Sequence, residues 1–304
     1  MDNRKLQIGN VILDLCKYSG NDQYSDGDIE DEILEAVKTG KDFDKYISDS
    51  SRFEVFYHLS KERELIAQIM DISKDDTVLE VGAGCGAVTG ALADKGKTVE
   101  CVELSYRRSM INAYRHRNYD NILINVGNYE VIQFEKKYDA ITLIGVLEYA
   151  GYYIHTANPY EDFLTDIRQK MADDGVLYIA IENRLGIKYF AGCKDDHLNK
   201  EYVGIEGYPD GARVRTFSYY ELKELFERCG FSEYKFFYPY PDYKFPHAVY
   251  SDDYLPRRGD FKEIGSNYTS SRRKIFNESH MLDSLVMKDE FKIFSNSFLI
   301  ALKK

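Results

Sequence analysis

The sequence contains no long apolar run, and this limits where the chain can be placed in a cell. A membrane-spanning helix needs about 18 or more consecutive apolar residues, and the 304 residues contain no such stretch. Charges interrupt residues 1–18, which also lack the apolar segment of a secretory signal. We therefore expect a cytoplasmic protein without a membrane span or an export signal.

Cysteines are few and show no paired spacing. The chain has five, none in a CxxC pair, and they are Cys16, Cys85, Cys101, Cys193 and Cys229. A disulfide framework or a structural zinc site would show regular or paired spacing. The sequence therefore predicts neither, assigns no metal ligand, and fits a reducing compartment.

Positive charge is also scarce. The formal net charge is -11, whereas a protein that binds nucleic acid needs clustered lysine and arginine to contact phosphates. Residues 1–50 hold 12 acids against 6 bases, and we interpret them as a solvated acidic face. No nucleic-acid partner is expected.

Tryptophan is absent, whereas the other aromatic residues are abundant. The chain has 26 tyrosines and 17 phenylalanines, and 44% of its residues are hydrophobic, which is enough to bury a sizeable core. We interpret most of these side chains as ordinary core or surface residues. Tyrosine also combines an apolar ring with a polar tip, which suits the walls of a binding pocket.

The predicted secondary structure changes near residue 75. Before it, residues 1–74 favour helices: Asp28 can cap a helix that ends at Gly40, and a second helix is expected from Ser60. After it, short apolar runs alternate with helical stretches, as in parallel βαβ winding. The five expected strands are 77–81, 98–103, 121–126, 138–144 and 176–182.

The C-terminal third predicts one well-marked helix and two more strands. Ser218 and Glu221 have capping-box spacing, and Gly230 can end the helix that they begin. The strands are expected at residues 233–240 and 291–304. About fifty residues between them are long for a loop in a compact domain, so we expect a functional insertion with some helix near its end.

Residues 76–86 read DTVLEVGAGCG and carry the most information. A strand enters a turn whose glycines let the backbone approach a ligand closely. On their own, Gly82, Gly84 and Ala87 also satisfy the dinucleotide fingerprint GxGxxG/A, with Glu103 placed as its ribose-binding acid. These residues alone are therefore also compatible with a dinucleotide-dependent dehydrogenase.

Two further residues favour a different cofactor. Glu80 precedes the first glycine by two residues, and Gly86 adds a third glycine to the turn. Here the chain resembles the class I S-adenosylmethionine-dependent methyltransferases, whose first motif is apolar, acidic, apolar, Gly-x-Gly-x-Gly. A sulfonium ligand has no pyrophosphate, so acidic groups replace the anion site. The resemblance implies S-adenosylmethionine as cofactor and S-adenosylhomocysteine as product.

The resemblance also implies which residues hold the cofactor. Glu80 would lie by its methionine end, Glu103 would accept the two ribose hydroxyls, and Asn128 stands where the family often has an aspartate that contacts adenine. The full implied set is Glu80, Gly82, Ala83, Gly84, Gly86, Glu103, Leu104, Asn128, Tyr129, Gly145 and Glu148.

The resemblance extends over about residues 57–304 and defines the expected architecture. It implies an α/β, Rossmann-like methyltransferase sheet of seven strands, with the last pair antiparallel. Residues 1–74 would form a helical N-terminal lid and residues 75–304 the catalytic domain. Insertions are expected at about 184–215 and 240–290.

The acceptor side of the site is less constrained by the sequence. A methyl transfer aligns a nucleophile with the sulfonium and, for a hydroxyl acceptor, also removes its proton. Tyr149 replaces the histidine of the family's common VLEH segment, so no histidine base is available there. We predict His197 as the base, with His58 as second choice. Residues expected to bind the acceptor are Tyr57, Tyr149, Asn183, Arg215 and His247.

Three segments, residues 57–60, 182–197 and 204–218, together resemble a bacterial methyltransferase subgroup associated with glycosyltransferases and surface-polysaccharide gene clusters. The resemblance implies O-methylation of a small molecule or of a sugar or glycan-precursor hydroxyl, and a glycosyltransferase as possible partner. A lipid, polyketide or amine acceptor stays open. So does a non-catalytic role, in which the fold supports a glycosyltransferase.

Overall fold

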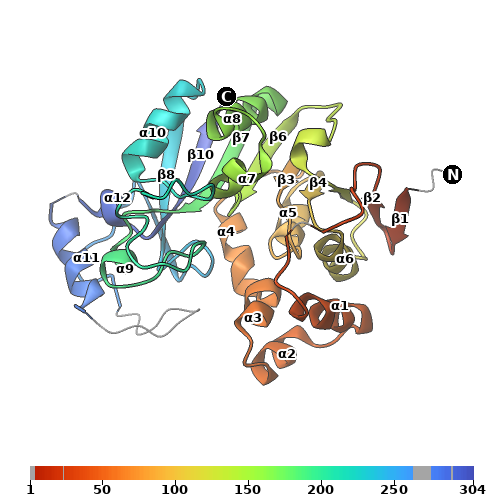
Figure 1. The fold of residues 1–304 in the computed structure, drawn as a ribbon, viewed down its shortest axis with the longest axis horizontal. Helices are drawn as coiled ribbons and strands as arrows, with labels where there is room; N and C mark the ends of the chain where they lie inside the picture. The colour runs from red at the N-terminus through yellow and green to blue at the C-terminus, as the bar shows by residue number, and fades with distance from the viewer. Residues whose placement is uncertain (1–3, 23, 263–274, 289) are drawn as a thin grey trace. The chain divides into compact units, whose positions relative to one another are not determined.

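The computed structural model describes residues 4–22, 24–262, 275–288 and 290–304 (Figure 1). Two compact units make up the chain. The first unit consists of the chain up to Leu143 together with Gln169–Val176. The second unit consists of Ile144–Arg168 together with Leu177–Lys304.

The first unit is built on strands that follow the order β1-β2-β5-β4-β3-β6. Their bounds are β1 (Lys5–Ile8), β2 (Val11–Asp14), β3 (Thr77–Val81), β4 (Thr98–Glu103), β5 (Ile122–Val126) and β6 (Tyr138–Ile144). The first four predicted strands, 77–81, 98–103, 121–126 and 138–144, are confirmed. β3 pairs in parallel with β4 and β6, and β4 pairs in parallel with β5. The carboxyl ends of these strands therefore meet at one edge.

The prediction that residues 1–74 are helical is wrong for residues 5–14, which form the antiparallel hairpin β1–β2. Ile8, Val11 and Leu13 are buried in the hairpin, and β2 continues the unit by pairing in parallel with β5. Gly9 turns the hairpin with a φ of 58°, where an added Cβ would lie 2.1 Å from the Arg117 carbonyl oxygen. Pairing with β5 outweighs any local helix preference.

Helices follow the hairpin, and α1, α2 and α3 lie together in Figure 1. As predicted, α1 begins after Asp28 and ends at Gly40 in the left-handed region, but the Asp28 side chain makes no capping hydrogen bond. Ser60 caps the next helical segment as expected. The helices of this unit are α1 (Ile29–Thr39), α2 (Phe43–Asp49), α3 (Phe53–Leu59), η1 (Lys61–Glu64), α4 (Leu65–Gln68), α5 (Thr89–Lys95), α6 (Tyr106–Arg115) and η2 (Tyr129–Val131).

The strands of the second unit follow the order β7-β10-β8-β9. Their bounds are β7 (Met171–Glu182), of which the last six residues belong to this unit, β8 (Glu233–Tyr240), β9 (Ala248–Ser251) and β10 (Ser297–Lys303). β8 and β10 are antiparallel, which confirms the predicted final pair. The last strand starts later than predicted because residues 291–294 are helical.

The described residues contain ten strands, so the prediction of seven is wrong. The additional strands β1, β2 and β9 are each four residues long. Runs this short carry little periodic signal, and β2 also pairs with β5, which is distant in the sequence. The prediction of an α/β fold with parallel strands and an antiparallel C-terminal pair is confirmed.

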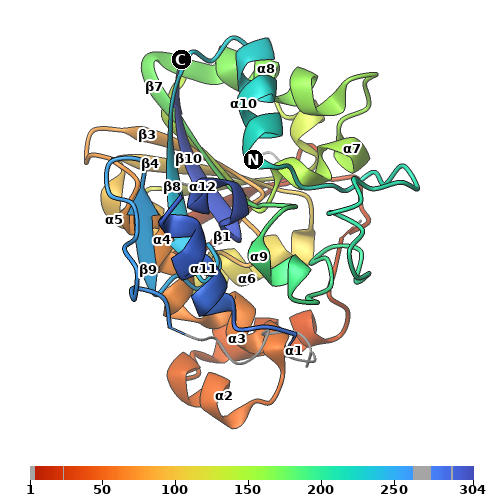
Figure 2. The same ribbon diagram turned by 90° about the vertical axis from the view of Figure 1, so that its left-hand side faces the viewer.

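The helices of the second unit include the capping box predicted at Ser218 and Glu221, which is present at the start of α10. They are η3 (Leu147–Tyr149), α7 (Ala150–Tyr153), α8 (Pro159–Lys170, with its last two residues in the first unit), α9 (Ile187–Phe190), α10 (Tyr219–Arg228), α11 (Glu278–Val286) and α12 (Phe291–Phe294). Figure 2 shows α11 beside α9 and α12.

The predicted insertion at 240–290 includes β9 and α11, whereas residues 263–274 and 289 lie outside the described residues. Aromatic rings pack around the strands here, with 5.4 Å between the ring centroids of Phe236 and Phe298 and 5.6 Å between those of Tyr238 and Phe291. In the described ranges, no helix combines the length and the apolar character needed to cross a membrane.

Candidate functional site

The glycine turn after β3 depends on conformations that other residues rarely adopt. The φ angles of Gly82, Gly84 and Gly86 are 74°, 54° and 76°. A Cβ on Gly86 would lie 2.4 Å from the Asn112 side-chain oxygen, so this glycine also permits close packing against α6. No atom lies within 4 Å of a Cβ built on Gly84, which leaves open space in front of the turn.

Glu103 closes β4 and holds the same turn from the neighbouring strand. Its Oε2 accepts the N–H of Gly84 at 2.7 Å, and its Oε1 accepts the N–H of Ser105 at 2.8 Å. Burial raises the pKa of the Glu103 carboxyl, and the nearby Arg108 guanidinium opposes this rise. Each carboxylate oxygen can accept more than one hydrogen bond, so capacity for hydroxyl donors remains.

Glu80 is buried on β3, which lies between β4 and β6. Its Oε2 accepts the hydroxyl of Thr89 at 2.6 Å, and the thiol of Cys101 lies 3.4 Å from the same oxygen. Burial raises its pKa to about 7. At neutral pH this carboxyl is therefore divided between its protonated and ionised forms.

The other cofactor residues predicted in the first unit lie on the loops after β3, β4 and β5. Ala83 and Tyr129 are buried, and Leu104 is half-buried. The Asn128 side chain accepts the N–H of Glu130 at 3.3 Å and caps η2. The parallel register brings these loops to one edge together with the glycine turn. Their part in cofactor binding stays a prediction.

His58 and Tyr57, predicted for the acceptor side, lie on α3 in the first unit. The His58 Nε2 is 2.8 Å from the Asp26 carboxylate, and burial lowers the pKa of this histidine. The guanidinium of Arg63 lies over the Tyr57 ring, 4.1 Å from its centroid. Both side chains are thus engaged with the first unit, and their acceptor roles stay predictions.

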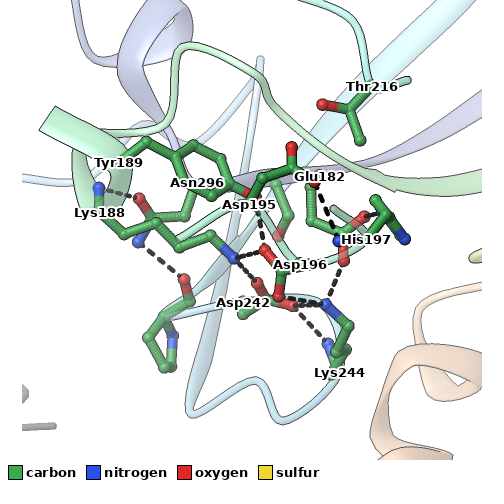
Figure 3. A network of polar contacts seen from close by, with 12 residues as sticks. Glu182, Lys188, Tyr189, Asp195, Asp196, His197, Thr216, Asp242, Lys244 and Asn296 are labelled. Carbon is green, nitrogen blue, oxygen red and sulfur yellow. Dashed lines mark hydrogen bonds and ion pairs between the residues drawn. The ribbon is translucent and has the colours of Figure 1, made fainter. Parts of the chain in front are cut away.

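Three ionisable side chains converge in the second unit, and we call them the EEH cluster: Glu148, Glu182 and His197. Glu148 lies in η3, Glu182 ends β7, and His197 follows in a loop (Figure 3 shows the last two). The His197 Nε2 is 3.4 Å from the Glu182 Oε2 and 3.9 Å from the Glu148 Oε1. The three side chains are at most 8% exposed.

Hydrogen bonds fix both the loop that carries His197 and the orientation of its ring. Asp195 accepts the backbone N–H groups of His197 and Leu198 at 3.0 and 2.8 Å, which shapes the loop. The hydroxyl of Tyr149 lies 3.0 Å from the His197 Nδ1. The opposite nitrogen, Nε2, consequently faces the two carboxylates.

Two lysines complete the charged surroundings of the EEH cluster (Figure 3). Lys244 pairs with the Glu182 Oε1 and also lies 3.1 Å from Asp196. Lys188 lies 3.0 Å from Asp196 and 2.8 Å from Asp242. These ion pairs occupy one oxygen of Glu182 and leave the other directed at His197.

The cluster contains polar atoms that the protein does not satisfy. Among the described residues, both oxygens of Glu148, the Oε2 of Glu182 and the Nε2 of His197 are buried without a hydrogen-bond partner. Native proteins pair most buried polar atoms, so a group of four calls for an explanation. The atoms of the cluster that face one another are the unsatisfied ones.

Protonation of the cluster follows from these neighbours. Burial disfavours the charged form of His197, but Glu182 and Glu148 outweigh it and raise its pKa to about 9. Burial also raises the pKa of Glu148, to about 8. Burial alone would raise the pKa of Glu182, yet Lys244 and His197 hold it well below its usual range. At neutral pH His197 carries a proton in this arrangement and must lose it before it can act as a base.

Two of the three remaining predicted residues of the second unit have side-chain partners, and the third is exposed. The Asn183 amide donates to the carbonyls of Ile293 and Ser295, both at 2.7 Å. Arg215 lies 3.2 Å from the Glu221 carboxylate. His247 is exposed between β8 and β9.

Gly145 has a φ of 68°, and a Cβ there would lie 2.7 Å from the Tyr243 hydroxyl. Its N–H donates to the Ala180 carbonyl at 2.9 Å, which fixes the start of the loop that carries Glu148 and Tyr149. The structure thus brings Glu148, Tyr149 and His197 together. Their positions do not test the predicted roles in binding and catalysis, which stay predictions.

Sequence reasoning did not bring the three members of the EEH cluster together, and it missed the charged residues that surround them. The cluster's members are separated by 34 and 15 positions, a spacing that matches no metal motif. Lys188, Asp242 and Lys244 were not assigned either, because lysines and aspartates usually face solvent. Only the fold shows that they form ion pairs with one another and with Asp196.

Comparison with known proteins gives one consistent result. A family model described as methyltransferase domain matches residues 52–234. The demethylmenaquinone methyltransferase of Tropheryma whipplei is 23% identical over 182 residues, which cover 56% of this chain and 72% of that protein. The ribosomal RNA small subunit methyltransferase A of Syntrophus aciditrophicus is 28% identical over 80 residues, 26% of each chain.

One solved structure is similar over most of its length. It is a chain of the complex between the Haloferax volcanii Trm112 methyltransferase activator and a methyltransferase. The TM-score is 0.50 at 16% identity, and the match covers 86% of this chain and 96% of the other. At this identity the similarity concerns the fold alone.

Proposed function

Because the chain belongs to the methyltransferase domain family, we propose that it transfers the methyl group of S-adenosylmethionine to a hydroxyl of a small molecule or sugar. Its fold is that of an α/β, Rossmann-like methyltransferase, and it is an enzyme that depends on S-adenosylmethionine. The proposal concerns the identity of the acceptor. The observation that supports it is the EEH cluster.

The first unit offers groups that fit the cofactor. Gly84 leaves open space in front of the turn, and the carboxylates of Glu80 and Glu103 lie on the two strands beside it. When bound, S-adenosylmethionine supplies a methyl group on a positively charged sulfur. Carboxylates favour such a cation, and Glu103 retains capacity to accept ribose hydroxyls.

The second unit offers groups for the acceptor. A hydroxyl must lose its proton during methyl transfer, so it needs ionisable groups near its oxygen more than an already nucleophilic atom does. The EEH cluster provides two carboxylates and an imidazole in a buried setting. This supports a hydroxyl acceptor, with His197 as the central residue of its activation and Tyr149 as the residue that orients it.

Sugars and glycan precursors are the proposed acceptor class. The support is the resemblance of residues 182–197 and 204–218 to methyltransferases associated with polysaccharide clusters. In the segment 238–254, Tyr254 is 60% exposed and offers an aromatic face of the kind that packs on sugar C–H surfaces. A glycosyltransferase partner is part of the same proposal and has the same support.

We also propose that residues 1–74 act as a lid on the cofactor. Within the first unit, Asp22 accepts the backbone N–H groups of Tyr106 and Arg107 at the start of α6, at 2.6 and 3.1 Å. Asp26 pairs with Arg108 at 2.8 Å. These contacts attach the N-terminal segment to the residues that directly follow Glu103.

The test combines calorimetry with a transfer assay. Purified protein is titrated with S-adenosylhomocysteine and then incubated with S-adenosylmethionine and sugars or polyols, each paired with its deoxy analogue. We expect binding, and release of S-adenosylhomocysteine with hydroxylated acceptors but not with the deoxy analogues. Equal turnover with amines, or with the deoxy analogues, would contradict a hydroxyl acceptor without affecting the assignment of the cofactor.

A further inference from the structure

The unsatisfied atoms of the EEH cluster are arranged as metal ligands, and we infer that Glu148, Glu182 and His197 bind a divalent metal ion that holds the acceptor hydroxyl. The inference rests on the proposed function in one respect, because it assigns the ion to the acceptor. The existence of the site rests on geometry alone.

The distances fit one ion. One atom from each side chain can be chosen so that all three lie within 4.8 Å of one another. Two of the separations are 3.4 and 3.9 Å, both measured from the His197 Nε2. Ligand atoms at about 2.0–2.3 Å from a common ion are separated by such distances. An ion placed among them would satisfy polar atoms that lack a hydrogen-bond partner in the described part of the chain.

The surroundings orient the ligands as they do in metal sites. A metal-bound histidine usually directs its other ring nitrogen to a polar partner, which fixes the ring. Here the Tyr149 hydroxyl lies 3.0 Å from the Nδ1 of His197. Lys244 contacts one oxygen of Glu182 and leaves the other directed at His197. Lys244 and the metal ion would therefore contact different oxygens of Glu182.

The charges also favour a divalent cation. The ion-paired network around the cluster contains four carboxylates and two lysines: Glu148, Glu182, Asp196, Asp242, Lys188 and Lys244. Metal ligands bind in their deprotonated forms, and once Glu148 and His197 have lost their protons the four carboxylates outnumber the two lysines by two negative charges. Buried charge is costly unless it is paired, and a doubly charged ion balances it.

The ligand types indicate which ion to test. Two carboxylate oxygens and one imidazole nitrogen suit zinc or manganese, whereas magnesium prefers oxygen ligands alone. Three protein ligands leave coordination positions for substrate. A metal-bound hydroxyl has a lowered pKa and passes its proton to water. The oxygen then bonds to the methyl carbon while the carbon–sulfur bond breaks, and both electrons of that bond go to sulfur.

The experiment measures the ion directly. The purified full-length protein is dialysed against a chelator, reloaded with Mn²⁺ or Zn²⁺, and analysed by elemental mass spectrometry and calorimetry. We expect about one ion per chain in the wild type. E148Q and H197A should bind about 100-fold more weakly or not at all, and Y149F about 10-fold more weakly because it changes only an outer partner.

H280A is the matched control, since His280 is exposed on α11, outside the EEH cluster. It should bind the ion as the wild type does. Circular dichroism of every variant shows that the protein is folded, and S-adenosylhomocysteine titrations of H197A and H280A read out the cofactor independently. A metal-dependent rise in melting temperature in the wild type, absent in E148Q, gives a second measure of the same site.

The outcomes separate the two proposals. If the wild type binds no stoichiometric ion, or if E148Q and H197A bind it equally well, the metal site is wrong. Undiminished methyl transfer by the chelated protein would also overturn the metal's role. An ion bound at one per chain and lost in both variants supports the site even if no hydroxyl acceptor is ever methylated, which would count against the proposed function alone.

Discussion

The two units differ in the hydrogen bonding of their buried carboxylates. In the first unit, Glu80 and Glu103 accept hydrogen bonds from neighbouring protein groups at 2.6–2.8 Å. In the second, both oxygens of Glu148 lack such a partner among the described residues. The glycine turn is thus completed by the protein itself, whereas the EEH cluster is incomplete without a ligand.

This difference separates two tasks of a methyltransferase. A binding surface for a nucleoside cofactor works best when it is rigid before the ligand arrives, because ordering it later costs affinity. Groups that must exchange protons or coordinate an ion need unsatisfied positions. Substitutions in the first unit should therefore affect binding and stability, and substitutions in the second should affect the transfer step.

The largest effect is expected from H197A in the second unit. Removal of a group that activates the acceptor slows transfer by about 100-fold or more, because proton removal contributes that much to catalysis. The affinity for S-adenosylhomocysteine should stay unchanged. Steady-state kinetics and calorimetry measure the two quantities, and H280A is the control. An unchanged rate would remove His197 from the site.

The next effect concerns stability in the first unit. G86A should lower the free energy of unfolding by about 3 kcal/mol, since it combines a strained φ with a Cβ placed 2.4 Å from the Asn112 side chain. G84A is the matched control, because it shares the positive φ but meets no atom within 4 Å. It should cost about 1 kcal/mol. Equal losses in urea denaturation would show that packing against α6 is unimportant.

Cofactor affinity should respond to E103Q. The substitution removes a charged acceptor, and hydrogen bonds to charged groups contribute about 1.5–3 kcal/mol, so the affinity for S-adenosylhomocysteine should fall about 10- to 100-fold. E100Q, on the same strand, is the control and should bind normally, because Glu100 instead accepts the Tyr138 hydroxyl at 2.7 Å. If both variants bind as the wild type does, Glu103 does not contact the cofactor.

The smallest effect is a pH dependence of cofactor binding. The pKa of Glu80 is about 7, so raising the pH from 6 to 8 converts this carboxyl from mostly protonated to mostly ionised. The ionised form attracts the cationic cofactor, so the affinity for S-adenosylmethionine should rise with pH, by at most about tenfold. E80Q should abolish the dependence. A profile that E80Q leaves unchanged would assign it to another group.

The first unit could be predicted well because its signals are local. The residues of the glycine turn are adjacent in the sequence, and the strands on either side are continuous apolar runs. The hairpin of residues 5–14 was missed because its strands have only four residues each and β2 is stabilised by pairing with β5, more than 100 residues later. Periodicity within a short segment does not report such a partner.

The candidate acceptor site could be predicted only in part, for the same reason. His197 was selected because it follows a strand, and Tyr149 because of the resemblance. Glu148 was predicted to be a cofactor residue. Neither the sequence around Glu148 nor the sequence around His197 indicates that the two side chains face each other. The contact between Lys244 and Glu182 could not be predicted either, because the sequence of a loop does not indicate whether its lysine faces solvent.

The order of apolar runs, the glycine turn and the two acids beside it were determined by the sequence, because backbone preference and hydrophobic periodicity act over a few residues. The tertiary structure alone decided that Glu148, Glu182 and His197 share one buried place with Lys244. Proton affinity and metal binding depend on distance and burial in space, and the chain brings these side chains together only when its strands have paired.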